Sequence, residues 1–380
     1  MIVGIDASRN RSGGAIAHIV GILSSFQPER YGIQQVHLWS YQSLLDQVPD
    51  HQWLVKHSTT YLEGSLFSQL WWQALILKNE LKMFQCDILF ATDASTLCRF
   101  SPMVVLSQDM LSYETGVMRY FGLGLAKLCL LALLFIQNLA FRRAAGVMFL
   151  TRYAGEVIQR SCGILENVTY VPHGVDEAFN SVRHIGAKSG DKDQSLRCLY
   201  VSPVWEFKHQ WVVVRAIAAL RERGYELSLD LVGGGRERAM RILQQQIAES
   251  DPKQQFVRYH NSVSQHRLPE MIIDTDLFIF ASSCENLPIT LLEAMAVGVP
   301  IACSNRGPMP EVLQDGGVYF DPEQDQDIAV AIEQLINNLS LRQSVAKRAK
   351  ALSEQYSWEQ CADRTWAFLV HTYARRNETR

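Results

Sequence analysis

The sequence predicts an α/β fold, in which parallel sheets are covered by helices on both faces. Short apolar runs alternate with helix-like segments along the chain, and this order is typical of parallel sheets. The length of 380 residues suits two or three domains. Nearly half of the residues are hydrophobic and a fifth are charged, as in folded globular proteins.

In the first half of the chain, strands are expected at residues 2–5, 36–39, 53–57, 87–91, 103–107, 146–151 and 169–172. A helix is expected from Gly13 and another over 66–84. Gly13 and Gly14 open the first helix, where a missing Cβ lets backbone N–H groups approach a ligand closely. Taken alone, two glycines in a turn between a strand and a helix more often reflect plain turn chemistry, so both interpretations stay open. Arg9 and Arg11 either add charge there or are simply solvated.

Residues 121–141 form the most apolar segment, and 128–136 is uninterrupted. Lys127, Gln137 and Asn138 interrupt a span that barely approaches bilayer length, which argues against a transmembrane helix. The favoured interpretation is a core helix of the first domain. The alternative is an interfacial helix resting on a membrane, whose terminal arginines meet anionic lipid.

In the second half, strands are expected at 196–201, 227–232, 277–280, 301–304 and 318–320, and helices at 211–220, 310–312, 327–339, 341–356 and 357–373. Residues 181–195 are polar and poor in apolar side chains, so they are predicted to form an interdomain linker. A frayed tail is expected from Arg375 onward.

The stretch 277–300 carries the strongest functional pattern. A buried strand and a short polar loop precede a helix that begins near Pro288 and ends near Gly298. The unpaired N–H groups of its first turn and the helix dipole favour an anion. Glu285 comes just before that turn and Glu293 lies one to two turns inside, and carboxylates accept hydrogen bonds from sugar hydroxyls. A nucleotide-sugar, with hydroxyls on both sides of its phosphates, fits this arrangement.

From Glu285 to Glu293 the sequence resembles the E-x7-E signature of the family 4 retaining glycosyltransferases, which have the GT-B fold. The match includes the flanking pattern Ser-x-x-Glu-Asn-x-Pro and Leu-Glu-Ala-Met-Ala-x-Gly-x-Pro. The resemblance covers nearly the whole chain and is strongest over 201–322. It implies two facing Rossmann-like domains. Their expected bounds are 1–180 for the acceptor domain, with a helix at 357–380 crossing back to it, 181–195 for the linker, and 196–356 for the donor domain.

The resemblance also implies roles for single residues. Glu285 would hold the hexose hydroxyls, and Glu293 the ribose. Lys208 matches the lysine that binds the donor pyrophosphate, although Pro203 stands where relatives carry the partner arginine. The site therefore lacks one positive charge, which Arg9 or Arg11 would supply. Further donor contacts are implied at Gly13, Gly14, Gln108, Gly233, Asn286, Leu287, Pro288, Ile289 and Gly307.

Gln108 falls where many relatives carry a histidine directed at the donor sugar. An amide can hydrogen-bond a sugar hydroxyl but cannot take a proton, so this position favours substrate positioning over general-base catalysis. His173 replaces an asparagine of the family's turn at this point, and a role as a hinge residue is expected.

The reaction implied is transfer of a hexosyl group, with retention, from a UDP- or GDP-sugar to a hydroxyl of a sugar or lipid-linked sugar, in bacterial envelope polysaccharide or glycolipid synthesis. Lys208 and the helix N–H groups would stabilise the leaving charge, without cofactor or metal. The expected location is the cytoplasm, with the inner face of the plasma membrane as the alternative if 121–141 makes a peripheral contact.

Two alternative functions remain. One is a nucleotide-sugar epimerase of GT-B fold, and the other is a non-catalytic sugar-nucleotide-binding protein.

Composition narrows the partners further. The net charge of -3 gives no case for nucleic-acid binding. The eight cysteines form no C-x-x-C and no cluster with zinc spacing, so free thiols in a reducing cytosol are expected. The N-terminus enters a strand directly and does not resemble a signal peptide.

The sequence Asp274-Thr275-Asp276 mimics the metal-binding DxD motif of other glycosyltransferases. It precedes a strand, at the end opposite the ligand crevice, so it is discounted as a metal site.

Overall fold

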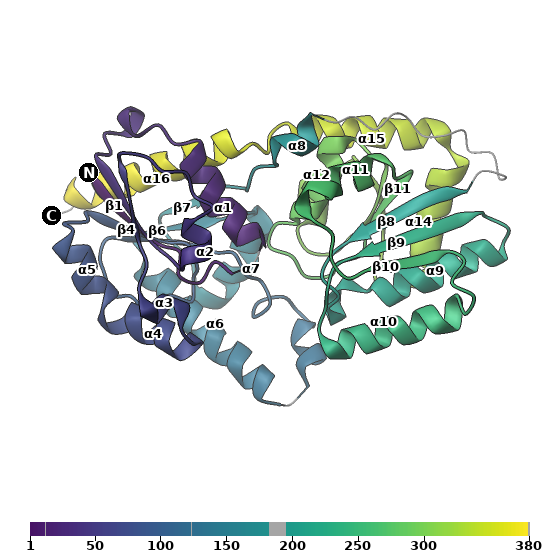
Figure 1. The fold of residues 1–380 in the computed structure, drawn as a ribbon, viewed down its shortest axis with the longest axis horizontal. Helices are drawn as coiled ribbons and strands as arrows, with labels where there is room; N and C mark the ends of the chain where they lie inside the picture. Colours follow the sequence, from purple (N-terminus) through teal and green to yellow (C-terminus); the bar gives the residue numbers. More distant parts are fainter. Residues whose placement is uncertain (12, 123, 182–194, 379–380) are drawn as a thin grey trace. The chain divides into compact units, whose positions relative to one another are not determined.

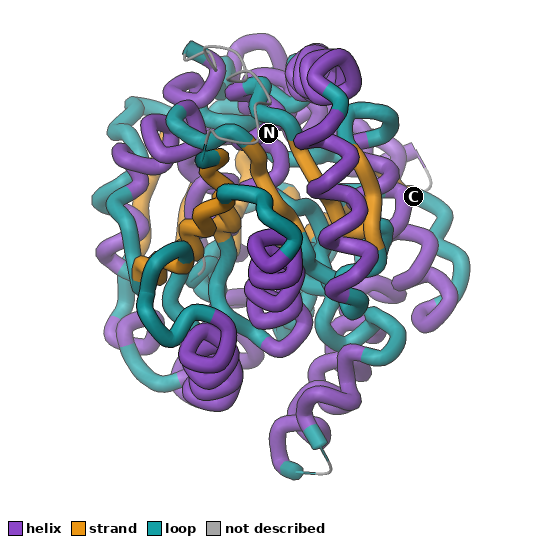
Figure 2. The backbone as a smooth tube through the Cα atoms, turned by 90° about the vertical axis from the view of Figure 1, so that its right-hand side faces the viewer, coloured by secondary structure: helices purple, strands orange, loops and turns teal. Residues whose placement is uncertain are grey.

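The computed structural model describes residues 1–11, 13–122, 124–181 and 195–378, and the chain divides into two compact units (Figure 1). The first unit comprises Met1–Gly174 and Tyr356–Arg380, and the second comprises Val175–Gln355. Each unit contains one parallel sheet, and helices lie on both sides of the strands (Figure 2).

The first unit has a seven-stranded sheet, in the order β3-β2-β1-β4-β5-β6-β7. Its strands are β1 (Ile2–Asp6), β2 (Gln35–Trp39), β3 (Leu54–His57), β4 (Ile88–Ala91), β5 (Met103–Leu106), β6 (Gly146–Phe149) and β7 (Val168–Tyr170). Every residue of β4, β5 and β6 is buried, because helices cover both faces of this sheet. The strand order reverses between β1 and β4, and ligands of such sheets bind beyond the carboxyl ends of the strands at this switch point.

The helices of the first unit are α1 (Gly13–Ser24), η1 (Pro28–Tyr31), α2 (Gln42–Leu45), α3 (Thr60–Glu63), α4 (Leu66–Leu75), α5 (Leu77–Met83), η2 (Val117–Phe121), α6 (Leu125–Arg143), α7 (Arg152–Cys162) and α16 (Trp358–Glu378). The C-terminal helix α16 packs against α1 (Figure 1). Trp366 fixes this contact, since it is buried, stacks on Phe26 at 3.9 Å between ring centroids and donates a hydrogen bond to the Ile22 carbonyl at 3.2 Å. The return of the last helix to the first unit is therefore a property of the fold, as the resemblance implies.

The second unit has a six-stranded sheet, in the order β10-β9-β8-β11-β12-β13. Its strands are β8 (Leu196–Val201), β9 (Leu227–Val232), β10 (Val257–His260), β11 (Leu277–Phe280), β12 (Ile301–Ser304) and β13 (Val318–Phe320). All their pairings are parallel, and the order reverses between β8 and β11. The switch point of this sheet therefore lies between the loops that follow β8 and β11.

The helices of the second unit are α8 (Glu177–Asn180), η3 (Glu206–Lys208), α9 (Gln210–Glu222), α10 (Glu237–Ser250), η4 (Gln265–Arg267), α11 (Leu268–Ile273), α12 (Ile289–Val297), α13 (Met309–Leu313), α14 (Asp325–Asn337) and α15 (Leu339–Ser353). Helix α9 packs against α10 and α14, and α12 packs against α15. Helix α12 begins after Pro288 and ends at Gly298, whose φ of 81° lets its N–H cap two carbonyls of the last turn, as predicted.

The boundary between the units lies at Gly174, whereas residue 180 was expected. The short helix α8 explains the difference, because it packs against α12 of the second unit. The predicted linker, 181–195, lies almost entirely outside the described residues, since 182–194 are not described.

Two smaller expectations are also wrong. The helix expected over 66–84 is two helices, α4 and α5, with a break at Ile76. The tail expected to fray from Arg375 continues as helix to Glu378. Side chains of this last helix hold it to the first unit, because Tyr373 donates to Asp87 at 3.1 Å and Arg376 donates to Ser101.

The core interpretation of residues 121–141 is wrong for most of the segment. Helix α6 buries only 22% of its apolar window, and Leu125 and Phe135 are 76% and 71% exposed. Its length and composition would allow it to cross a membrane. The sheet covers one narrow side of the helix, so high hydropathy here does not mark a buried element.

Candidate active site

The loops that follow β8 and β11 form the switch point of the second sheet. The first of them, 202–209, carries Lys208, and the second, 281–288, carries Glu285. Helix α12 starts at the end of the second loop. The parallel pairing of β8 with β11 therefore brings together residues that are far apart in the sequence.

Lys208 and Glu285 form an ion pair. Their side chains are only 11% and 14% exposed, so water screens the pair weakly. The ammonium group also lies 5.6 Å from the ring centroid of Phe207 and 5.9 Å from that of Phe280. The lysine expected to bind the phosphates and the glutamate expected to bind the hexose are thus direct neighbours. Each balances the charge of the other.

Hydrogen bonds hold the two loops against each other. The Ser283 N–H donates to the Phe207 carbonyl at 2.9 Å, and the Ser283 hydroxyl lies 2.9 Å from Nε2 of His209. The buried Tyr200 hydroxyl donates to the Lys208 carbonyl at 2.6 Å. His209 adopts a left-handed φ of 53° at the start of α9. These contacts fix the backbone on both sides of Lys208 and so determine where its ammonium group lies.

The start of α12 is tied to the same edge of the sheet. The Thr290 hydroxyl donates to the carbonyl of Val201, the last residue of β8, at 3.2 Å. Asn286 and Leu287 are buried in the loop before the helix, Pro288 is its N-cap residue, and Ile289 is its first residue. The first-turn N–H groups of a helix attract anions, so this end of α12 is suited to a phosphate.

Glu293 lies in the second turn of α12 and is only 9% exposed. Among the described residues, no group hydrogen-bonds its Oε2 atom. Burial, with a smaller contribution from the charge of Asp176, raises the pKa of this carboxyl to about 8. An unsatisfied buried carboxyl is costly, and such groups concentrate at functional sites.

Gly233 supports the loop that carries Lys208. Its φ is 134°, and a Cβ built there would lie 2.3 Å from the Ser202 carbonyl oxygen. Two residues later, Gly235 bridges to Val204 in the same loop. Close packing alone explains why a glycine occupies this position. The predicted contact of Gly233 with a donor stays a prediction.

Gly233→Ala is expected to destabilise the protein by about 1–3 kcal/mol. The positive φ at this position disfavours a side chain, and the new Cβ would clash with the Ser202 carbonyl oxygen. Gly13→Ala is the matched control, since a Cβ at Gly13 would meet nothing within 4 Å. Urea unfolding measures both, and the control should stay within about 0.5 kcal/mol of the parent. Equal stability of the two variants would contradict this explanation.

Arg236 was missed in the sequence. It follows the glycine turn after β9, and its guanidinium lies 4.3 Å from the ring centroid of Trp205, in the Lys208 loop. Arg11, expected to replace the charge absent at Pro203, instead donates to the Leu62 carbonyl at 2.6 Å and lies over the Tyr41 ring at 3.7 Å. Arg236 is therefore the better candidate for the missing positive charge.

Gly307 follows β12, the neighbour of β11, and has a left-handed φ of 57°. It stands beside Arg306, whose guanidinium pairs with Asp321 at 2.6 Å. The structure therefore places Gly307 along the same carboxyl edge as Glu285, as expected from the sequence.

Gly13, Gly14 and Gln108 lie in the first unit, at the carboxyl edge of its sheet. The two glycines open α1, and Gln108 follows β5. Among the described residues, none hydrogen-bonds the buried Nε2 atom of Gln108. Their placement at a switch-point edge agrees with a binding role.

Three carboxylates at this edge were missed as candidates. Asp6 ends β1, Asp93 follows β4 and Asp109 follows β5. Burial raises the pKa of Asp6 and of Asp109, and the charge of Asp93 adds to both shifts. Asp6 is held by Ser8 at 2.6 Å and by Gln73 at 2.7 Å. The position of each aspartate directly beyond a predicted strand was the signal that would have found them.

The discounted DxD lies where expected, before β11 and away from the switch-point loops. Asp276 accepts a hydrogen bond from the Arg197 N–H at 2.9 Å, which is a structural role. In the described part of the chain, no three His, Cys, Asp or Glu side chains gather in a way that would hold a metal ion.

Comparison with known structures defines the class of protein first. Sucrose-phosphate synthase from Thermosynechococcus elongatus matches with a TM-score of 0.78 at 14% identity, over 98% of this chain and 99% of that one. Anabaena HepE in complex with UDP-glucose matches with a TM-score of 0.71 at 18% identity, over 97% and 99%. Two Rossmann-like units with this architecture make the fold GT-B.

The sequence comparison points to a family. Residues 183–352 match the family model of glycosyl transferases group 1. Escherichia coli O-antigen chain mannosyltransferase B is 33% identical over 120 residues, and the D-inositol 3-phosphate glycosyltransferase of Paenarthrobacter aurescens is 24% identical over 226 residues. The alignments cover 32% and 58% of this chain, and 32% and 54% of the two relatives.

Proposed function

We propose that the protein is a family 4 retaining glycosyltransferase that moves a hexosyl group from a nucleotide-sugar to a hydroxyl. The observation that carries the proposal is the Lys208–Glu285 pair at the switch point between β8 and β11, beside the start of α12. The E-x7-E spacing, the match to glycosyl transferases group 1, and structural neighbours described with UDP and UDP-glucose support it.

The donor diphosphate binds Lys208, the N–H groups at the start of α12, and Arg236. Its negative charge takes the place of Glu285 beside the ammonium group. The freed carboxylate of Glu285 then accepts hydrogen bonds from the hexose hydroxyls. Glu293, whose buried oxygen lacks a partner among the described residues, accepts from a ribose hydroxyl.

In the reaction, the bond between the anomeric carbon and the diphosphate oxygen breaks, and the acceptor oxygen bonds to the same face of that carbon. The transition state resembles an oxocarbenium ion beside a leaving diphosphate. The acceptor hydroxyl loses its proton to the leaving phosphate. Lys208 and the α12 N–H groups lower the barrier, because in the donor complex they lie beside the leaving diphosphate and stabilise the charge that develops on it.

The acceptor binds at the carboxyl edge of the first unit's sheet, where Asp93 and Asp109 offer groups that pair with sugar hydroxyls. Relatives include an O-antigen chain mannosyltransferase and a putative colanic acid biosynthesis glycosyltransferase of Escherichia coli. Their names support a role in polysaccharide synthesis. A sugar or lipid-linked sugar acceptor, an envelope polysaccharide or glycolipid product, and a location on the cytoplasmic side of the plasma membrane are parts of the same proposal.

A thermal-shift screen with UDP-, GDP- and ADP-sugars tests donor binding. A ligand at a hundred times its dissociation constant stabilises the folded protein by about 2.7 kcal/mol, so the matching donor should raise Tm clearly. No shift with any nucleotide-sugar would contradict the proposal. Conversion of the donor without an acceptor would indicate an epimerase. Binding without transfer to any acceptor would indicate a sugar-nucleotide-binding protein, the function that Pro203 in place of an arginine would favour.

EDTA is expected to leave the transfer rate unchanged within about twofold, because Lys208 and helix N–H groups stabilise the leaving charge in this scheme. Product formation is measured with and without EDTA, after the protein has been passed over a chelating resin. Loss of activity that Mg²⁺ or Mn²⁺ restores would show that a metal ion takes part.

A further inference from the structure

One side of α6 is apolar and exposed. Leu125, Leu128, Leu131 and Phe135 follow one another at helical spacing, and all four are exposed. The buried residues of the helix, Leu130, Gln137, Ala140 and Phe141, point the other way, toward the first unit. Apolar side chains therefore occupy the side of α6 that would normally be polar.

Helix α4 extends this surface. Leu66, Phe67, Trp71 and Leu75 are exposed along it. Ala74 and Leu75 from α4 and Ile136 and Leu139 from α6 line one cavity of about 410 Å³, so the C-terminal ends of the two helices lie close together (Figure 1). We call the exposed side chains of residues 66–75 and 125–135 the α4–α6 face. Eight large exposed apolar side chains on two neighbouring helices exceed the scattered single residues of an ordinary surface, and such apolar surface marks an interaction site.

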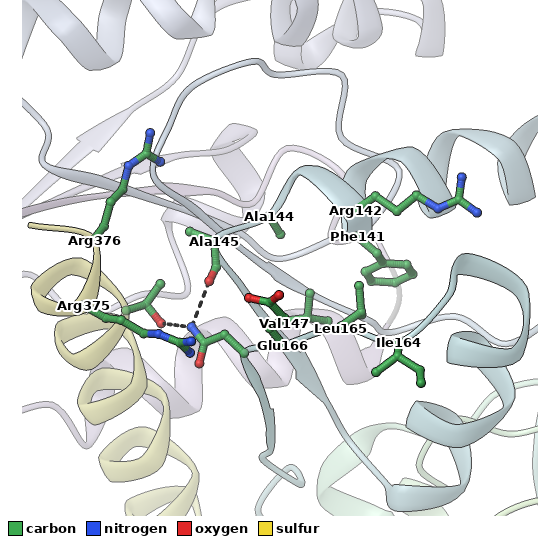
Figure 3. Close-up of a pocket in the computed structure, with 12 residues that line it drawn as sticks. Phe141, Arg142, Ala144, Ala145, Val147, Ile164, Leu165, Glu166, Arg375 and Arg376 are labelled. Carbon is green, nitrogen blue, oxygen red and sulfur yellow. Dashed lines mark hydrogen bonds between the residues drawn. The ribbon is translucent and has the colours of Figure 1, made fainter. Parts of the chain in front are cut away.

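The charges carried by the two helices are basic. Neither α4 nor α6 contains an acidic residue, and α6 ends with Arg142 and Arg143. Arg99 and Arg143 line the cavity between the two helices. Also at the C-terminal end of α6, Arg142, Arg375 and Arg376 line a second cavity of about 490 Å³ together with Glu166 (Figure 3). A group of cations therefore lies next to the C-terminal end of the apolar surface.

We propose that the α4–α6 face docks on the surface of an anionic lipid bilayer. Leucine, phenylalanine and tryptophan side chains enter the boundary between headgroups and acyl chains, and the arginines meet lipid phosphates. A bilayer fits better than a protein partner, because its headgroups supply negative charge around an apolar layer. Helix α6 lies along the membrane and does not cross it, since its inner side packs against β5 and α7.

The inference concerns where the proposed enzyme works, and it does not depend on the transfer reaction. A lipid-linked acceptor would be met at the docked surface. The main donor residues of the proposal, Lys208, Glu285 and Glu293, lie in the second unit, so membrane docking and donor binding can be tested separately.

Flotation of the full-length protein with vesicles tests the proposal. Vesicles of phosphatidylcholine alone are compared with equimolar phosphatidylcholine and phosphatidylglycerol. We expect the protein to float with the mixed vesicles, and to do so at least about tenfold less with phosphatidylcholine alone or in high salt. Protein that stays at the bottom of both gradients would overturn the proposal.

Two sets of variants separate the apolar contribution to membrane binding from the basic contribution. The double variant L128Q/F135Q is expected to lose at least about tenfold in flotation, and Trp71→Gln is an independent variant on α4. Arg99→Gln with Arg143→Gln should abolish the preference for anionic vesicles. Val330→Gln, an exposed apolar residue of the second unit, is the matched control and should float like the parent.

All variants should keep the parent Tm and the donor-induced thermal shift, because the altered side chains are exposed and lie outside the donor unit. Flotation of L128Q/F135Q and of Trp71→Gln at the parent level would contradict the proposal. A second outcome would also contradict it: the parent protein does not bind vesicles and sediments as a dimer, and the L128Q/F135Q substitutions dissociate this dimer. The α4–α6 face would then bind a second copy of the chain.

Discussion

Replacing Lys208 with alanine is expected to lower kcat by about ten- to thousandfold, because the leaving diphosphate loses its nearest cation. The structure holds this ammonium group against Glu285 in a poorly screened ion pair, and hydrogen bonds from Ser283 and Tyr200 fix the loop that carries it. The rate of product formation at saturating donor measures the effect. KM for the donor should rise as well, since the same cation binds the ground-state diphosphate.

Two controls separate chemistry from folding. Lys347→Ala removes an exposed lysine of α15 in the same unit and should leave kcat unchanged. Lys208→Arg keeps the positive charge and should recover part of the rate, although its planar group cannot reproduce the position of the ammonium. Near-normal turnover of a folded Lys208→Ala enzyme would refute the assignment of this residue.

Glu293→Gln is expected to make the protein more stable and less active. The folded pKa of about 8 lies above the ordinary value near 4.5, so the folded state holds the proton more tightly than the unfolded state. Between these two pH values the unfolded chain releases the proton first, and the free energy of unfolding falls as pH rises, by roughly 1 kcal/mol per pH unit. Glutamine does not titrate, so its stability advantage over glutamate should grow from pH 5 to pH 8.

The activity of this variant should change in the opposite direction. An amide offers only one acceptor oxygen to the ribose hydroxyls, so kcat/KM for the donor should fall about ten- to thousandfold. Thermal unfolding at pH 5 and pH 8 and steady-state kinetics with the donor measure the two effects. Glu354→Gln, at an exposed position directly after α15, is the control and should change neither. A variant with full activity would remove Glu293 from the site.

The sequence predicted most strands of both sheets, because strands buried on both faces are continuous apolar runs. It did not reveal β10 (Val257–His260), where Arg258 is exposed and only one neighbouring strand pairs with it. Edge strands carry such polar residues, and their pattern resembles that of a loop. The error over α6 has a different cause. Hydropathy measures the preference of side chains for an apolar environment, but it does not tell whether protein or lipid supplies it.

The candidate site was partly visible in the sequence. Glu285, Pro288, Glu293 and Gly298 belong to one local pattern, and the helix they predicted is present. The pairing of Lys208 with Glu285 depends on β8 lying beside β11, which no local pattern contains. Arg236 was missed for the same reason, because its contact with Trp205 joins the loops after two different strands.

A crystal structure of the protein with the nucleotide that gives the largest thermal shift tests the central claim most directly. The account predicts that a diphosphate oxygen lies within hydrogen-bond distance of the Lys208 ammonium and of the first N–H groups of α12, and that a ribose hydroxyl reaches the Glu293 carboxylate. A nucleotide bound away from the loops after β8 and β11, with the Lys208–Glu285 pair intact, would contradict it.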